Sequence, residues 1–302
     1  MATRGPVRWS VALPTEQVER GAELISAEAV GEMAAALEAA GVDACHVTDR
    51  PYPPESWVAA GGHHALDPLI VRSFAAAATR RLMLHTNVYI AAYRHPVLAA
   101  HGIATLDALS GGRLIVGLAV GYLESEFAAL GVDHRRRGAL LDEAVARMTA
   151  AWAGEPGPRG NALRPAPAAR PHPPLWFGGN SVSAIRRAVR SGQGWSPAPA
   201  SQAFAKRIQT TPLADLGDLK RVIGDLHAAA EQAGRTAPID ICCVPFTHPH
   251  HRALFDPPRL VDEARRMAEL GATWLSVRLP APSRTGYLEN VERFGAEVVR
   301  AW

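Results

Sequence analysis

Apolar and polar positions alternate between two patterns along almost the whole chain. Short, nearly continuous apolar runs, typical of strands buried on both faces, are separated by longer stretches with apolar residues at helical spacing. The apolar runs predict strands at residues 8–13, 44–48, 82–90, 114–120, 175–177, 194–196, 239–244 and 274–277. The helical spacing predicts helices at residues 26–40, 67–79, 96–109, 138–153, 181–191, 215–233, 258–270 and 285–300.

Strands that alternate with helices are typical of βαβ units and a parallel sheet. Eight such strands fit a closed (β/α)8 TIM barrel better than an open sheet, so the predicted fold class is α/β. The chain has 302 residues, of which 48% are hydrophobic, and this is enough for the core of one large barrel. We therefore expect a single domain over residues 1–302.

One segment interrupts the alternation. Residues 154–174 are dense in Pro, Gly and Ala and show no apolar period. They are too many for an ordinary loop between a helix and a strand. We expect an insertion near the barrel mouth, and the stretch 198–213 is a second candidate to line that mouth.

The charge pattern does not point to nucleic acid. The formal net charge of +3 comes from arginine rather than lysine, and no stretch combines basic with aromatic residues as a nucleic-acid groove does. The run Arg135–Arg137 could bind phosphate or form a solvated face beside a helix start.

Cysteine usage and the N-terminus bear on the compartment. Of the three cysteines, Cys242 and Cys243 are adjacent in an apolar strand, which predicts buried thiols rather than a disulfide framework. The N-terminus lacks the apolar run of a signal peptide, and no apolar stretch approaches the roughly 20 residues of a membrane helix. We expect a cytoplasmic protein without a membrane partner.

The segment 104–143 indicates both the fold and the place of a site. A helix ends at the pair Gly111 and Gly112, a buried strand follows, and Gly121 and Tyr122 come directly after that strand. In a parallel barrel, the C-terminal ends of the strands are where ligands bind.

A second candidate site is the run Gly178, Gly179, Asn180 and Ser181, between a predicted strand and a helix. Backbone N–H groups at a helix N-terminus bind anions, and glycines let the backbone approach closely. The run therefore predicts a phosphate site. The alternative is a tight turn in which Ser181 only caps the helix.

Three spaced motifs carry a resemblance to a known family. They are LDALSGGRL followed by GYLESEF and R-R-G-x3-D-E, then PPLWFGGNS, and the opening VALPT. From about Val7 to Gly234 the chain resembles the bacterial luciferase-like flavin and deazaflavin superfamily, and most closely its probable coenzyme F420-dependent oxidoreductases. The resemblance implies F420 as cofactor, with FMN as the alternative, because both carry a phosphate. It also implies a homodimer formed through the helices around the second to fourth strands, and a lid role for residues 154–174, although an excursion away from the site fits equally well.

The resemblance assigns roles to residues after the second and third strands. It implies a cis peptide between Asn87 and Val88 that backs the cofactor ring. Many relatives have His directly after the counterpart of Asp49, near the reacting centre, where this chain has Arg50. Arginine stays charged and cannot exchange a proton near neutral pH. Arg50 therefore either faces an anionic or carbonyl-bearing substrate, or the charge of the cofactor, or forms an ion pair at the rim.

The remaining expected site residues follow other strands. Tyr122 stands where relatives have Trp or Glu, and its phenol either donates a hydrogen bond or proton or walls the pocket. The glycines make room for a ring, and the tryptophan packs beside the cofactor tail: Gly117, Gly121, Gly194 and Trp195. His248 and Arg278 are candidate substrate contacts, with a rim ion pair as the alternative for Arg278.

Two kinds of site are not expected. The histidines at 63–64 and those within 248–251 lack the helical spacing and the carboxylate of a metal site. No G-x-G-x-x-G fingerprint follows the first strand, which argues against a dinucleotide domain.

The expected function is F420-dependent hydride transfer between the deazaflavin C5 and a small organic substrate. The reaction would reduce a C=C or C=N bond or oxidise an alcohol. Arg50 and Tyr122 would act on the substrate. The alternatives are an FMN-dependent monooxygenase that uses O2, and a barrel that binds a flavin without catalysis.

Overall fold

The eight strands form one closed, all-parallel barrel in chain order, which confirms the predicted fold class. The structure is a computed structural model, and it describes residues 7–248 and 255–301. Each strand lies within two residues of its predicted bounds: β1 Arg8–Ala12, β2 Ala44–Val47, β3 Met83–Tyr89, β4 Leu114–Leu118, β5 Leu175–Gly178, β6 Gly194–Ser196, β7 Asp240–Cys243 and β8 Trp274–Val277.

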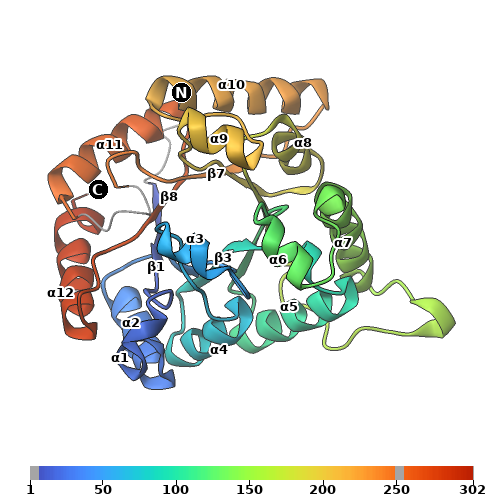
Figure 1. Cartoon of the computed structure of the whole chain (residues 1–302), viewed down its shortest axis with the longest axis horizontal. Helices are drawn as coiled ribbons and strands as arrows, with labels where there is room; N and C mark the ends of the chain where they lie inside the picture. Colours follow the sequence, from blue (N-terminus) through green and yellow to red (C-terminus); the bar gives the residue numbers. More distant parts are fainter. Residues whose placement is uncertain (1–6, 249–254, 302) are drawn as a thin grey trace. The chain divides into compact units, whose positions relative to one another are not determined.

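The long helices between the strands also match the prediction, and Figure 1 labels them. They are α2 Ala27–Ala39, α4 Pro68–Ala78, α5 Pro96–Ser110, α7 Arg137–Trp152, α8 Val182–Ser191, α10 Leu216–Gln232, α11 Pro257–Leu270 and α12 Arg284–Phe294, which continues as a π-helical turn, Gly295–Val299. The short helices were not predicted: α1 Ala22–Ile25, α3 Glu55–Ala59, α6 Glu124–Ala129, α9 Gln202–Ile208 and the 3-10 turns Val18–Arg20, Ala91–Tyr93, His134–Arg136 and Pro158–Gly160.

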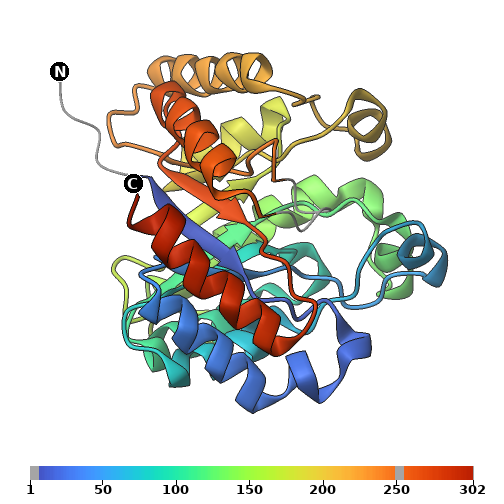
Figure 2. The ribbon, with the colours of Figure 1, turned by 90° about the vertical axis from the view of Figure 1, so that its left-hand side faces the viewer.

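The chain divides into two compact units. Unit 1 comprises Met1–Pro14, Met33–His46 and Leu175–Trp302, and unit 2 comprises Thr15–Glu32 and Val47–Pro174. In unit 1, β1 pairs with both β2 and β8, so that Ser10 lies opposite Ala44 on one side and Ser276 on the other. Figure 2 shows β1, in blue, beside β8, in red.

Alternate residues of β1 point to opposite faces of the sheet. Trp9 packs edge-on against Phe294 of α12, at 5.3 Å between ring centroids. Ser10, the next residue, points the other way and lies 3.1 Å from Nδ1 of the buried His46. Nε2 of His46 lies 3.4 Å from the hydroxyl of Ser276. The inner face of these strands therefore carries a buried polar group that bridges β1, β2 and β8.

In unit 2, β3 and β4 pair closely, with a register shift between Thr86 and Tyr89. Gly117 belongs to β4, and a Cβ at this position would lie 2.0 Å from the carbonyl oxygen of Thr86. Glycine is therefore required here by the approach of β3. Gly117 was expected to make room for a ring, and strand contact is the reason that the structure shows.

Three helices of unit 2 pack in sequence order, α4 against α5 and α5 against α7 (Figure 1). Arg72 of α4 is fully buried and donates to the carbonyl oxygens of Val47 and His85, tying the helix to the ends of β2 and β3. A buried guanidinium is tolerated here because carbonyl oxygens satisfy its donors.

The insertion at 154–174 leaves α7 and returns past the end of α5. Its Ala169 N–H donates to Asp107 of α5 at 2.8 Å, and the His172 ring lies 5.7 Å from that of Trp152. Asp107 lies just before Gly112 and the start of β4, so these contacts are at the N-terminal end of β4. Gly121 and Tyr122 follow the other end. The lid interpretation is therefore wrong for this part of the segment, because a loop from a helix to a strand lies at the strand N-termini.

The cysteines are buried free thiols, as predicted from the apolar strand that contains two of them. Cys45, Cys242 and Cys243 are all buried free thiols. Burial raises the pKa of Cys243 to about 12. Within residues 7–248 and 255–301, no helix is both long and apolar enough to cross a membrane.

Candidate active site

One candidate site lies in unit 2, at the C-terminal ends of β2, β3 and β4. Asp49, two residues after β2, is buried and fixes the chain after β3. Its carboxylate accepts from the Ile90 N–H at 2.9 Å and from Arg94 at 2.6 and 3.0 Å. Asp49 was expected to bind the cofactor, and the structure shows its oxygens engaged in holding β2 and β3 together.

Arg94 completes this network. Its guanidinium also reaches Asp67, at 3.4 Å, and lies 4.3 Å from the Tyr89 ring centroid. Burial alone would lower the pKa of Arg94, but the hydrogen bonds and charge of Asp49 raise it. Arg94, which follows β3, thereby joins Asp49, which follows β2, to Asp67, which directly precedes α4.

The peptide bond between Asn87 and Val88 is cis, as the resemblance implied. It lies inside the register shift of β3, with both side chains partly exposed. Tyr89, the next residue, is buried and pairs with Leu118 of β4. The bulged part of β3 thus lies near the C-terminal end of that strand, as Asp49 lies at the C-terminal end of β2.

Arg50 is held on three sides. Its Nη1 donates to Oε2 of Glu126 at 2.9 Å. Its guanidinium lies 5.0 Å from the Trp57 ring centroid and 4.4 Å from that of Tyr122. The side chain is only 7% exposed, so Arg50 is not part of a rim ion pair.

Glu126 is the anchor of this cluster. It is fully buried and accepts from the Tyr93 hydroxyl at 2.9 Å and from the Tyr52 N–H at 3.3 Å, as well as from Arg50. These contacts give Glu126 a structural role, because one carboxylate orders three neighbouring groups. Sequence reasoning missed Tyr93 and Trp57, which lie in short irregular segments without any periodic pattern.

The electrostatics of the cluster follow from burial and proximity. Burial alone would lower the pKa of Arg50. Its neighbours Tyr122, Glu126 and Tyr93 raise this pKa by more, so the net shift is upward. Burial, followed by the charge of Glu126, raises the pKa of Tyr93. The cluster therefore combines a permanent cation with a phenol that stays protonated, and it can hold an acceptor group without exchanging a proton through Arg50.

A second candidate site lies in unit 1, between the end of β5 and the start of α8. Gly179 has φ +113°, a conformation that favours glycine, and its N–H donates to Ser196 at 3.1 Å. Ser181 is the N-cap of α8 and accepts from the Ala184 N–H at 3.2 Å. The tight turn and the cap are both observed, and they leave the N-terminus of α8 suitable for an anion.

Asn180 has a long-range role that its sequence does not show. Its amide donates to Ala198 at 2.8 Å and Thr211 at 3.0 Å and accepts from the Ala198 N–H at 2.9 Å. The backbone N–H of Asn180 donates to Thr210. Both the side chain and the backbone N–H of Asn180 thus hold the segment around α9, and these bonds give no support to the expected cofactor contact.

The predicted residues of β6 have different roles. Trp195 is fully buried and its Nε1 donates to the Gly179 carbonyl oxygen at 2.9 Å. A Cβ at Gly194 would lie 2.4 Å from the Trp176 ring. Trp195 therefore braces the turn at Gly179, whereas Gly194 leaves room for the Trp176 ring of β5.

His248 follows β7 and is engaged at both ring nitrogens. Nδ1 lies 2.9 Å from the Thr247 hydroxyl, and Nε2 accepts from the Asp256 N–H at 3.1 Å. Thr247 in turn donates to the buried Glu263. Burial lowers the pKa of His248 despite the charges of Glu263 and Asp256. Both ring nitrogens of His248 are therefore used by neighbouring residues of the same segment. These bonds give no support to its predicted substrate contact.

Two further predictions concern Arg278 as a substrate contact and the absence of a metal site. Arg278 follows β8 and is half-buried. His250 and His251 lie outside the described residues. In the described ranges, no three His, Cys, Asp or Glu side chains gather as a metal ion would require.

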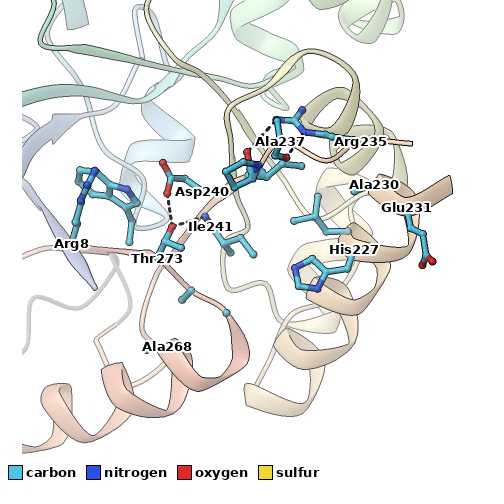
Figure 3. A pocket seen from close by; sticks show the side chains of 16 residues that line it. Arg8, His227, Ala230, Glu231, Arg235, Ala237, Asp240, Ile241, Ala268 and Thr273 are labelled. Atoms are coloured by element: carbon cyan, nitrogen blue, oxygen red, sulfur yellow. Dashed lines mark hydrogen bonds between the residues drawn. The ribbon is translucent and has the colours of Figure 1, made fainter. Parts of the chain in front are cut away.

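A cavity of about 780 Å³ lies in unit 1, away from the strand ends discussed above (Figure 3). Arg8, Asp240 and Trp274 line it, and each is the first residue of its strand. The cavity is therefore at the N-terminal ends of β1, β7 and β8. In Figure 3, Thr273 donates to Asp240 at 2.8 Å, so this carboxylate is already partnered.

Comparison with known proteins identifies the family. A family described as luciferase-like monooxygenase matches residues 7–255. This chain belongs to that family. The match covers most of the barrel and all the site residues discussed in unit 2.

Individual relatives in this luciferase-like family divide between chemistries. An uncharacterized protein of Mycobacterium tuberculosis is 28% identical over 246 residues, 77% of this chain and 76% of the relative. The F420-dependent glucose-6-phosphate dehydrogenase of Beutenbergia cavernae is 36% identical over 168 residues, 52% of this chain and 48% of the relative.

The solved structures agree on the fold. The monooxygenase RslO1 from Streptomyces bottropensis superposes with a TM-score of 0.80 at 17% identity, over 98% of this chain and 99% of that structure. At this identity, the similarity concerns the fold alone. The family is that of luciferase-like oxidoreductases and monooxygenases, and a flavin or deazaflavin is the plausible cofactor.

Proposed function

We propose that this luciferase-like protein is an F420-dependent oxidoreductase. The observation that carries the proposal is its 36% identity, over 168 residues, with a dehydrogenase that is named as F420-dependent. When bound, the deazaflavin supplies hydride chemistry at its C5, and the protein supplies orientation and electrostatics. The substrate is a small organic molecule in which a C=C or C=N bond is reduced or an alcohol is oxidised.

The residues present fit such a cofactor. In unit 1, Gly178 and Gly179 carry no side chain just before α8, where a phosphate would meet the N–H groups of the first helical turn and the positive end of the helix. Trp195 supports this turn. This part of the proposal assigns the phosphate to residues 178–181.

In unit 2, we assign the ring to the bulge at Asn87 and Val88, and to the backbone at Gly121. Gly121 has φ +75°, and a Cβ there would come within 3.0 Å of Ile90 and Phe127. Arg50 and Tyr122 act on the substrate. Arg50 holds or polarises an acceptor group, and the Tyr122 phenol donates a hydrogen bond or a proton.

The second candidate is an FMN-dependent monooxygenase, which the description of the matched family as luciferase-like monooxygenase brings forward. Oxygen consumption separates the two. Reduced F420 and reduced FMN are each supplied with a panel of ketones, enones, imines and alcohols, while cofactor oxidation and O2 uptake are recorded together. Hydride transfer predicts substrate-dependent oxidation of reduced F420 without O2 uptake. O2 uptake with reduced FMN alone would favour the monooxygenase, and turnover with neither cofactor would favour a non-catalytic barrel.

We also propose that the protein is a homodimer through α4 and α5. These two packed helices expose large apolar side chains that a single copy leaves uncovered: Ile70, Phe74, Val97, Leu98 and Leu109. Leu98 and Leu109 are 70% and 75% exposed. Several large apolar side chains exposed on two packed helices are typical of a protein interface. A second copy of the chain, which presents the same helices, fits this face by two-fold symmetry.

A further inference from the structure

We infer that the free edge of the Arg50 guanidinium binds a carboxylate, so that the substrate of the proposed reaction is a small organic acid. The inference rests on the proposed function and names the chemical class of its substrate.

The first observation is an unequal use of the guanidinium donors. An arginine side chain has five N–H donors, and Arg50 uses Nη1 to reach Glu126. Within residues 7–248 and 255–301, its Nε and Nη2 make no hydrogen bond. Although the side chain is only 7% exposed, neither nitrogen is among the buried side-chain atoms of the described residues that lack a partner, so this edge faces solvent and is open to a ligand. The open, unused edge therefore points to an acceptor that the protein does not itself provide.

The second observation is that the guanidinium cannot turn to find another partner. Trp57 and Tyr122 lie 5.0 and 4.4 Å from it, and Glu126 is itself fixed by the Tyr93 hydroxyl and the Tyr52 N–H. A guanidinium held in this way presents Nε–H and Nη2–H as two parallel donors. Two parallel donors match the two oxygens of a carboxylate, which makes this geometry more selective than a single charge.

The third observation concerns charge. Glu126 accepts from three donors, so Arg50 supplies only part of its compensation. Arg94, the neighbouring cation, is committed to Asp49 and Asp67. In the described part of this cluster, Arg50 is thus the cation with donors left for a ligand. A neutral carbonyl oxygen would use one of the two donors and leave the other unsatisfied.

The test measures binding of benzoate and of benzamide, its neutral analogue of similar shape, by calorimetry. Titrations use the protein without cofactor and with saturating F420 or FMN. We expect benzoate to bind about tenfold more tightly than benzamide in at least one of these forms, as a charge-assisted bidentate pair implies. Arg50→Gln should abolish this preference, and Arg50→Lys should reduce it, because lysine keeps the charge without the fork. Arg136→Gln, a matched change at an exposed ion pair, should leave it unchanged.

Equal binding of benzoate and benzamide by the natural protein would overturn the inference, as would a preference that survives Arg50→Gln. Failure of benzoate to bind any of the three forms would also overturn it. The comparison on the natural protein decides the matter even if a variant does not fold. Titration of F420 and of FMN alone reports cofactor affinity separately, so a failure here is distinguishable from a failure of the proposed cofactor assignment.

Discussion

At the scale of single residues, the cluster around Glu126 shows how a buried charge is stabilised. A buried ion pair is costly in desolvation unless further hydrogen bonds satisfy it. Here Arg50, Tyr93 and the Tyr52 N–H all converge on one carboxylate. Removing that carboxylate would leave Arg50 as a buried cation without compensation.

We therefore expect Glu126→Gln to lower the free energy of unfolding by about 3–5 kcal/mol. Glutamine keeps the shape and removes only the charge, so the loss reports the ion pair. Glu143→Gln is the control, because Glu143 pairs with Arg136 where both side chains are more than half exposed, and it should cost less than about 1 kcal/mol. Urea denaturation measures both, and equal losses would contradict the assigned role of Glu126.

A second residue couples stability to pH. Burial, with a smaller contribution from Arg72, lowers the pKa of His85 from 6.5 to about 3. Below pH 6.5 the unfolded chain binds a proton at His85 that the native protein does not bind. The native state is therefore favoured fully above pH 6.5 and loses stability as the pH falls towards 3, by at most about 1.4 kcal/mol per unit from this residue.

Replacement of His85 by Gln should make the stability less dependent on pH. The measurement is the free energy of unfolding of both proteins at pH 7, 6 and 5. His134 and His248 shift in the same direction, so the variant should retain part of the slope. An unchanged slope in His85→Gln would mean that His85 accepts a proton in the native state.

At the scale of elements, one side chain ties the α8 turn to the segment that contains α9. Asn180 makes three hydrogen bonds to backbone groups of Ala198 and Thr211. The segment 198–213 otherwise has an isolated bridge between Ala200 and Leu213 and one short helix. Its order therefore depends strongly on Asn180.

Asn180→Ala should increase amide hydrogen exchange in residues 198–213 and lower the unfolding free energy by about 2 kcal/mol, since buried backbone groups lose their partners. Ser181→Ala is the matched control. It removes the α8 cap, at a cost of about 1 kcal/mol, and should leave exchange around α9 unchanged. Exchange that rises equally in both variants would show that the turn as a whole, and not Asn180, orders the segment.

The elements also show how much the sequence could predict. Apolar runs and helical spacing located all the strands and the long helices, because both patterns follow from burial. The short helices α3, α6 and α9 have too few residues for a period. The partners of Arg50 and Asn180 could not be predicted, since Glu126 and Thr211 are far away in sequence. The lid role of the insertion came from the resemblance, whereas the predicted order of helix, insertion and strand already implies the N-terminal ends of the strands.

At the scale of the whole molecule, the exposed apolar face of α4 and α5 predicts self-association. Analytical ultracentrifugation of the natural protein should give a molar mass twice that of the 32.2 kDa chain. The double variant Phe74→Glu and Leu109→Lys should be a folded monomer, because each change places a charge in the proposed interface. Val182→Glu, an exposed apolar position on α8, should remain a dimer. A monomeric natural protein would contradict the proposal.

The central claim is that this luciferase-like barrel uses a deazaflavin. Equilibrium binding of F420 and of FMN to the purified protein, each followed by fluorescence quenching, tests it most directly. The account predicts tight binding of F420 and clearly weaker binding of FMN. A preference for FMN would contradict it and make oxygen-dependent monooxygenation the leading function.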